Sequence, residues 1–151
     1  MSRVQLALNV DDVDEAVAFY AKLFGTEPAK RRPGYANFAI SEPPLKLVLL
    51  ENPGKGGSLN HLGVEVADTV AVDAAQTRLA AEGLASIDER GTTCCYAKQD
   101  KFWVQGAPGG EPWEIYTVLA DSQTFREEGA EDACCGSASQ GEEAAEAATC
   151  C

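Results

Sequence analysis

The order of hydrophobic and polar positions is the same in two stretches of the chain. Residues 4–10, VQLALNV, alternate as a half-buried β-strand does. An amphipathic helix follows, with Asp11 or Asp12 as its cap and Gly25 as its end. Its apolar positions form one stripe: Val13, Ala16, Val17, Phe19, Tyr20, Leu23 and Phe24.

The second copy begins at residue 60. Residues 60–66, NHLGVEV, read as a strand, Asp68 as a helix cap, residues 70–81 as a helix with Leu79 turned inward, and Gly83 as its end. The two strands carry Gln5 and His61 at equivalent positions, so the repeat predicts that these side chains come from equivalent places in two similar units.

Each strand and helix is followed by shorter apolar runs that predict further strands. These are residues 35–40 and 45–50 in the first copy, and about 87–96, 101–104 and 113–118 in the second. A loop rich in glycine, residues 52–57, separates the copies. We therefore expect an α+β fold of two βαβββ modules, about residues 1–52 and 58–120, whose curved sheets pair around a cleft.

Length and charge restrict the function. A chain of 151 residues with 45% apolar and 24% charged residues can bury one core without disulfides. It has no apolar run near the roughly 20 residues of a membrane-spanning helix and no apolar secretion signal after Met1, so we expect a cytoplasmic protein without a membrane partner. The net charge of -12 repels phosphate backbones and argues against nucleic acid.

The last part of the chain has a different composition. Residues 121–151 contain eight acidic residues and one basic residue, Arg126, and after Phe125 there is no Leu, Ile, Val, Phe, Tyr or Trp. Such a segment buries too little apolar surface to offset the entropy lost on ordering. We expect a disordered, acidic tail after a domain that spans residues 1–120.

All six cysteines occur as adjacent pairs: Cys94-Cys95, Cys134-Cys135 and Cys150-Cys151. Neighbouring Cα atoms are about 3.8 Å apart, closer than the roughly 4.4 to 6.8 Å of ordinary disulfides. In a reducing cytoplasm the pairs should remain free thiols, which bind soft metals or metalloids. Pairing by chance in an alanine- and glycine-rich tail is plausible for one pair and much less so for three.

Candidate metal ligands come from the repeat and from the last strand. His61 is the single histidine of the chain, Gln5 is its counterpart, and strand alternation places Glu114 and Tyr116 opposite Trp113 and Ile115. A carboxylate on an interior strand is costly to bury unless it is paired or bound to a cation. Taken singly, Glu114 could instead form a salt bridge and His61 could be a hydrogen-bonded core residue.

At these positions the chain resembles the vicinal oxygen chelate superfamily, which includes glyoxalase I, extradiol dioxygenases and fosfomycin-resistance proteins. The resemblance covers residues 3–119 and implies that Gln5, His61 and Glu114 are metal ligands. It departs from the dioxygenase pattern of two histidines and one carboxylate, because Gln5 replaces a histidine, and it lacks an aspartate in the turn at residues 107–111.

A narrower resemblance rests on residues 94–104, CCYAKQDKFWV, together with residues 60–63, NHLG, and the cysteine-containing tail. These segments resemble the ArsI-type organoarsenical carbon-arsenic lyases and the related cadmium-induced CadI proteins. The resemblance implies an enzyme that uses iron(II) and dioxygen to remove the organic group from trivalent organoarsenicals, such as methylarsenite and trivalent aromatic arsenicals, and to release arsenite.

Residue chemistry is consistent with this function. Trivalent arsenic with one carbon substituent has two remaining bonds, which Cys94 and Cys95 can satisfy while the carbon faces the metal. The expected cleft-lining residues are Tyr96, Lys98, Lys101, Phe102 and Trp103, and either lysine could lower the thiol pKa. The tail thiols Cys134, Cys135, Cys150 and Cys151 are expected to capture or hand off arsenic on a flexible tether.

Two other functions are compatible with the sequence. A non-catalytic protein could sequester cadmium or arsenite with its thiols, in which case Glu114 would be dispensable. Alternatively, the same scaffold could support a glyoxalase reaction or thiol transfer to fosfomycin, which leaves the cysteine pairs unexplained. The sequence leaves open whether the protein is a monomer or a homodimer.

Overall fold

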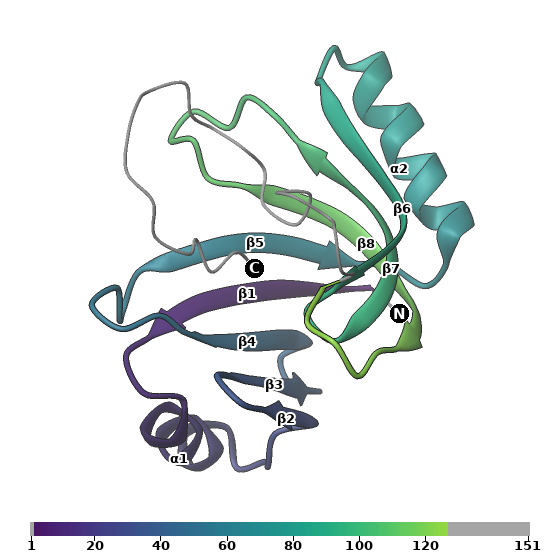
Figure 1. The fold of residues 1–151 in the computed structure, drawn as a ribbon. Helices are drawn as coiled ribbons and strands as arrows, with labels where there is room; N and C mark the ends of the chain where they lie inside the picture. Colours follow the sequence, from purple (N-terminus) through teal and green to yellow (C-terminus); the bar gives the residue numbers. More distant parts are fainter. Residues whose placement is uncertain (1, 127–151) are drawn as a thin grey trace. The chain divides into compact units, whose positions relative to one another are not determined.

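The computed structural model describes residues 2–126 (Figure 1). The chain divides after Glu65 into two compact units, here called the first unit and the second unit. The pairs Cys134-Cys135 and Cys150-Cys151 lie outside the described residues, as does most of the expected tail.

The first unit contains one helix and a mixed sheet whose strands lie in the order β2-β3-β4-β1-β5. β1 runs parallel to β4 and antiparallel to β5, and β3 is antiparallel to both β2 and β4. The elements are β1 (Arg3–Val10), α1 (Val13–Phe24), β2 (Lys30–Arg32), β3 (Tyr35–Ile40), β4 (Leu45–Glu51) and β5 (Leu59–Glu65).

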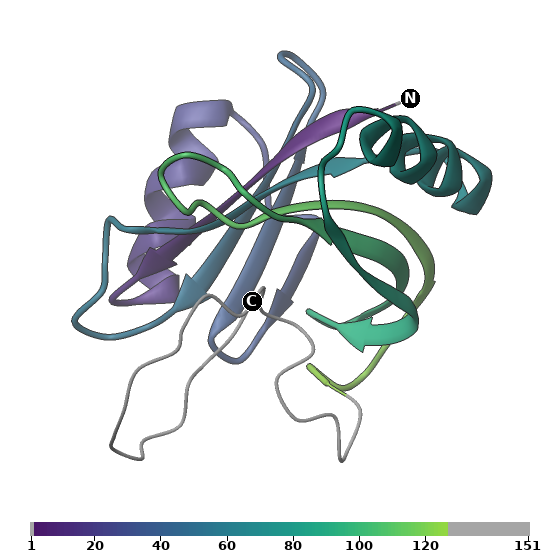
Figure 2. The same ribbon diagram turned by 90° about the horizontal axis from the view of Figure 1, so that it is seen from above.

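Helix α1 begins and ends where the sequence predicts. The Asp12 side chain accepts hydrogen bonds from the backbone N–H groups of Asp14 and Glu15, and Gly25 ends the helix in the left-handed conformation. Figures 1 and 2 show α1 against one face of the sheet. The apolar cluster between them consists of Val13 and Val17 from α1, Ala36, Phe38 and Ile40 from β3, and Leu47 and Leu49 from β4.

The predicted stripe on α1 was too wide. Phe19 and Leu23 are 59% and 58% exposed, whereas Val13 and Val17 are buried. The reason is the helical period: Val13, Val17, Tyr20 and Phe24 follow one another at intervals of three or four residues and face the sheet, and Phe19 and Leu23 lie beside that line.

The second unit contains α2 (Thr69–Ala81) and the antiparallel strands β6 (Ser86–Cys94), β7 (Ala97–Val104) and β8 (Trp113–Asp121), in the order β8-β7-β6. Asp68 caps α2, which packs on β7 and β8. The hydroxyl of Thr69 donates a 2.7 Å hydrogen bond to Asp100 on β7. No described helix is both long and apolar enough to cross a membrane.

The order of elements confirms the two βαβββ modules of the α+β prediction. Two details differ from the expected strands. β2 is a short extra strand, and β7 begins at Ala97 rather than at residue 101, because the chain reverses through only two residues, Cys95 and Tyr96. β5 begins the second module but belongs to the first unit, since it pairs along its length with β1.

Candidate functional site

Strand β1 separates polar from apolar side chains. Gln5, Ala7 and Asn9 are buried on one face, whereas Leu6, Leu8 and Val10 pack toward α1 on the other. The face opposite α1 also includes His61 of β5, because the antiparallel register pairs His61 with Ala7. The first unit thus carries a buried polar face on the side of its sheet away from the helix.

Gln5 and His61 come together on this polar face. Each is 4% exposed, and Gln5 Nε2 lies 3.0 Å from His61 Nε2. The other ring nitrogen, Nδ1, lies 2.7 Å from Asn60 Oδ1. Since a carboxamide oxygen only accepts hydrogen bonds, Nδ1 carries the ring proton, and Nε2 is left with the lone pair that a metal requires.

A network of amides fixes the orientation of Asn60. Asn60 Nδ2 donates to Asn9 Oδ1 at 3.0 Å, Asn52 Nδ2 donates to the same oxygen at 3.2 Å, and Asn9 Nδ2 donates to Ser58 Oγ at 2.9 Å. Because its nitrogen is committed to Asn9, Asn60 turns its oxygen toward His61. We did not assign Asn60 or Asn9 from the sequence, although Asn60 precedes His61 directly and this adjacency was the available signal.

Glu114 lies on a buried polar face of the second unit. It is 3% exposed, and its Oε2 lies 3.1 Å from Nζ of Lys101, which is itself 1% exposed. Lys101 Nζ also lies 3.6 Å from Glu89 Oε2 and 4.7 Å from the centre of the Trp103 ring. A buried carboxylate is therefore paired with a buried ammonium group, which satisfies the electrostatic requirement of both.

Glu89 completes this cluster and was missed by the sequence analysis. Trp103 Nε1 donates a 3.2 Å hydrogen bond to Glu89 Oε1, and burial raises the pKa of the Glu89 carboxyl although the charge of Lys101 opposes the shift. Side chains alternate between the two faces of a regular strand, but the register of β6 shifts between Glu89 and Thr92. Because of this irregularity, alternation along the sequence does not place Glu89 on the face of Glu114.

The residues present fit a divalent metal in their chemistry. An imidazole with an unprotonated Nε2, a carboxamide and a carboxylate are all buried, and these are donor types that divalent metals accept. Gln5 would have to turn its amide so that oxygen rather than nitrogen faces the ion. Within the described residues, no three His, Cys, Asp or Glu side chains form a metal cluster by themselves.

The inner cysteine pair lies at the tip of the β6–β7 hairpin. Cys94 pairs with Ala97, and the two residues of the turn, Cys95 and Tyr96, have φ values of 55° and 61°. This left-handed conformation is usual for glycine or asparagine in such turns and uncommon for a bulky side chain. The two sulfurs lie 3.2 Å apart, well beyond the roughly 2.05 Å of a disulfide bond.

The other predicted lining residues divide between the two faces of β7. Lys101 and Trp103 share the face of Glu114, whereas Lys98 is exposed and Phe102 is fully buried on the opposite face. That opposite face also carries Asp100, which bonds to Thr69 of α2. Tyr96 is half-buried in the hairpin turn.

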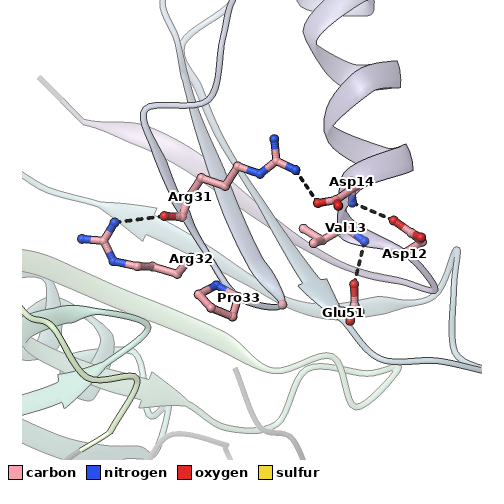
Figure 3. Close-up of a pocket in the computed structure, with 8 residues that line it drawn as sticks. Asp12, Val13, Asp14, Arg31, Arg32, Pro33 and Glu51 are labelled. Atoms are coloured by element: carbon pink, nitrogen blue, oxygen red, sulfur yellow. Dashed lines mark hydrogen bonds and ion pairs between the residues drawn. The ribbon is translucent and has the colours of Figure 1, made fainter.

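A separate hollow of about 590 Å³ lies at the start of α1 (Figure 3). Its polar groups bond to the start of the helix or to each other. Glu51 Oε2 accepts a hydrogen bond from the Val13 N–H at 2.9 Å, and Arg31 forms an ion pair with Asp14. None of the site residues predicted from the sequence lines this hollow. We assign no function to it.

Comparison with known proteins identifies the family. Residues 3–115 match the model of the glyoxalase/bleomycin resistance protein/dioxygenase superfamily. The chain belongs to this superfamily. Its resemblance to the vicinal oxygen chelate proteins is thereby confirmed.

Similar proteins narrow the relationship within this superfamily. The chain is 69% identical to the cadmium-induced protein CadI of Mycobacterium tuberculosis over 125 residues, which are 83% of this chain and 82% of the relative. It is 57% identical to a trivalent organoarsenical cleaving enzyme of Thermomonospora curvata, with both chains fully covered. An extradiol ring-cleaving dioxygenase from B. fuscum has the same fold, with a TM-score of 0.55 and 19% identity over 80% of this chain and 34% of that one.

Proposed function

We propose that this protein cleaves the carbon-arsenic bond of trivalent organoarsenicals and releases arsenite, in a reaction that uses iron(II) and dioxygen. The observation that carries the proposal is the inner thiol pair, two separate sulfurs 3.2 Å apart at a hairpin tip. Full-length similarity to an organoarsenical cleaving enzyme supports it. Methylarsenite and trivalent aromatic arsenicals are the proposed substrates.

Binding of the substrate follows from thiol chemistry. An organoarsenous acid carries one carbon and two hydroxyl groups on arsenic, and Cys94 and Cys95 replace both hydroxyls, with the loss of two waters. The pair then holds arsenic by two sulfur bonds, and its carbon substituent is the remaining group. Tethering converts an encounter in solution into a positioned reaction, which is a large kinetic advantage.

Gln5, His61 and Glu114 are the proposed iron ligands. Iron(II), when bound, would supply the activation of dioxygen. The chain itself prepares the ligands: Asn60 keeps the proton on His61 Nδ1, and the ammonium group of Lys101, which also contacts Glu89, compensates the charge of Glu114 in a buried setting. Trp103 donates to Glu89 and so limits the movement of that carboxyl.

The experiment that tests the proposal is anaerobic loading with iron(II), addition of methylarsenite, and admission of air with arsenic speciation. We expect arsenite release in the wild type and none in Cys94→Ser or Cys95→Ser, both with iron still bound, because oxygen is a poor ligand for so soft an element. His61→Ala and Glu114→Ala should instead lose iron. Turnover in either cysteine variant would refute the tethering mechanism.

Sequestration of cadmium or arsenite is the second candidate, favoured by the 69% identity to a cadmium-induced protein. A sequestering protein would release no arsenite from methylarsenite. Each inner-pair variant would then lose about a third of the bound metalloid, since it disables one thiol pair of three. Arsenite released per iron, measured beside arsenic bound per chain, separates the two functions.

A further inference from the structure

The chain beyond β8 turns back over the inner thiol pair. Residues 122–126, here called the strap, follow the end of β8 at Asp121. The Ser122 N–H donates a 2.9 Å hydrogen bond to the carbonyl oxygen of Tyr96, and the Cys95 N–H donates a 2.9 Å bond to that of Phe125. Arg126 forms an isolated antiparallel bridge with Cys94.

Phe125 is the apolar contact of the strap. Its ring meets the Tyr96 ring edge to face, with centres 5.4 Å apart, and packs with Cys95 against Cys94. Cys94 is only 1% exposed, whereas Cys95 is half-buried. The backbone of Cys94 is also bonded to Gln99, whose Nε2 donates to the Cys94 carbonyl oxygen at 3.3 Å.

We propose that Phe125 is a positioning residue for the arsenic-binding thiols: the strap covers Cys94, and it must lift before one arsenic atom can bond to both sulfurs. The proposal rests on the proposed function, because it concerns access to the same thiol pair. It adds an order of events, in which arsenic bonds first to the half-buried Cys95 and then to Cys94.

The contacts of the strap suit a segment that opens and closes. The attachment of the strap to the hairpin includes the hydrogen bonds of the Ser122 and Cys95 N–H groups and the Phe125 ring, whereas Gln123 and Thr124 between them are exposed. Short segments with exposed side chains can open locally at a small fraction of the cost of global unfolding. The same contacts engage Cys95 and Tyr96, the two left-handed residues of the turn, so a closed strap also restrains the hairpin that carries both sulfurs.

The test measures the reactivity of Cys94 and needs no turnover. In the full-length chain, Cys95, Cys134, Cys135, Cys150 and Cys151 are changed to serine, which leaves Cys94 as the sole thiol. Its alkylation by iodoacetamide is followed in this parent and in parents that also carry Phe125→Ala, Phe125→Leu or Gln123→Ala. Gln123 is the matched control, since it lies in the strap but is exposed.

We expect Phe125→Ala to accelerate alkylation on the order of tenfold, because the ring that covers Cys94 is gone. Phe125→Leu should give an intermediate rate and Gln123→Ala the rate of the parent. Ser122→Pro, which removes the N–H bonded to Tyr96, should also accelerate the reaction. Parent rates in both Phe125→Ala and Ser122→Pro, with native circular dichroism, would overturn the proposal.

A second readout separates positioning from stability. With all six cysteines present, the Phe125→Ala variant should bind a trivalent phenylarsenical faster than the wild type, but its kcat should be lower because the opened hairpin no longer fixes the sulfurs. Equal losses in binding rate and kcat would contradict positioning. If the wild type releases no arsenite, the proposed function fails while the alkylation rates still decide whether the strap covers Cys94.

Discussion

At the scale of single residues, the most informative contact is between Asn60 and His61. A ring nitrogen can bind a metal only without its proton, and which nitrogen carries that proton depends on the partner of the other. Asn60 supplies an acceptor to Nδ1, and Asn9 keeps Asn60 in that orientation. The first unit therefore presents His61 Nε2 in a form suited to a metal through residues outside the proposed ligand set.

Asn60→Ala should weaken iron(II) binding about 10- to 100-fold, the usual cost of losing a partner of a ligating histidine. Anaerobic titration with iron(II) measures the dissociation constant. Asn52→Ala is the control, since Asn52 donates to Asn9, whereas Asn60 bonds directly to the His61 ring. Unchanged affinity in Asn60→Ala would mean that Asn60 does not determine the tautomer.

Asp100 gives a prediction for pH. Hydrogen bonds from the Thr69 hydroxyl and the Gly91 N–H lower the pKa of the Asp100 carboxyl. The ionised form is therefore favoured by folding, and its contribution is present above the unfolded pKa of about 3.9 and is lost as pH falls through the lower folded value. Asp100→Asn should reduce the free energy of unfolding by about 1 kcal/mol at pH 7.

Urea unfolding at pH 7 and pH 3 tests this effect. The difference between wild type and Asp100→Asn should shrink at pH 3, and Thr69→Val should show a smaller pH dependence than the wild type. A difference that is the same at both pH values would assign the loss to packing rather than to charge.

At the scale of elements, hydrophobic alternation and helix capping predicted those features that depend on residues close together in the sequence. The strand at residues 4–10, the helix that ends before Gly25 and the place of Glu114 on the last strand all follow from local periodicity. The hairpin at Cys95 and Tyr96 could not be predicted, because neither residue type signals a left-handed turn. Contacts between distant segments, such as Lys101 with Glu89 and Glu114, were equally beyond a local pattern.

Helix caps offer a prediction at this scale. Asp12 accepts two backbone N–H groups at the start of α1, whereas Asp68 accepts one at the start of α2. Asp12→Ala should therefore lower the free energy of unfolding by about 1 to 2 kcal/mol, and Asp68→Ala by about half as much. Chemical denaturation measures both. A larger loss in Asp68→Ala would show that other contacts at the two termini outweigh capping.

At the scale of the whole molecule, sequence repeat and compact unit do not coincide. The repeat begins again at β5, but β5 pairs with β1 and so completes the sheet of the first unit. The second unit then contains α2, three strands and the strap. Among the described residues, contacts of the second unit continue past residue 120 to Phe125, which is the final large apolar residue of the chain.

The position of the strap predicts how far the chain can be shortened. A chain that ends at Arg126 keeps Phe125, which packs against Cys94, whereas a chain that ends at Asp121 lacks the strap. We expect the chain that ends at Arg126 to keep the circular dichroism spectrum of the full chain and its turnover at saturating methylarsenite. It should bind less arsenic per chain, because four of six cysteines are gone. The chain that ends at Asp121 should stay folded, since its strands are intact, but it should react faster with thiol reagents and turn over more slowly.

Two outcomes would contradict this account. Loss of turnover in the chain that ends at Arg126 would assign the tail thiols a part in catalysis. Equal thiol reactivity in both shortened chains would show that the strap does not shield the inner pair.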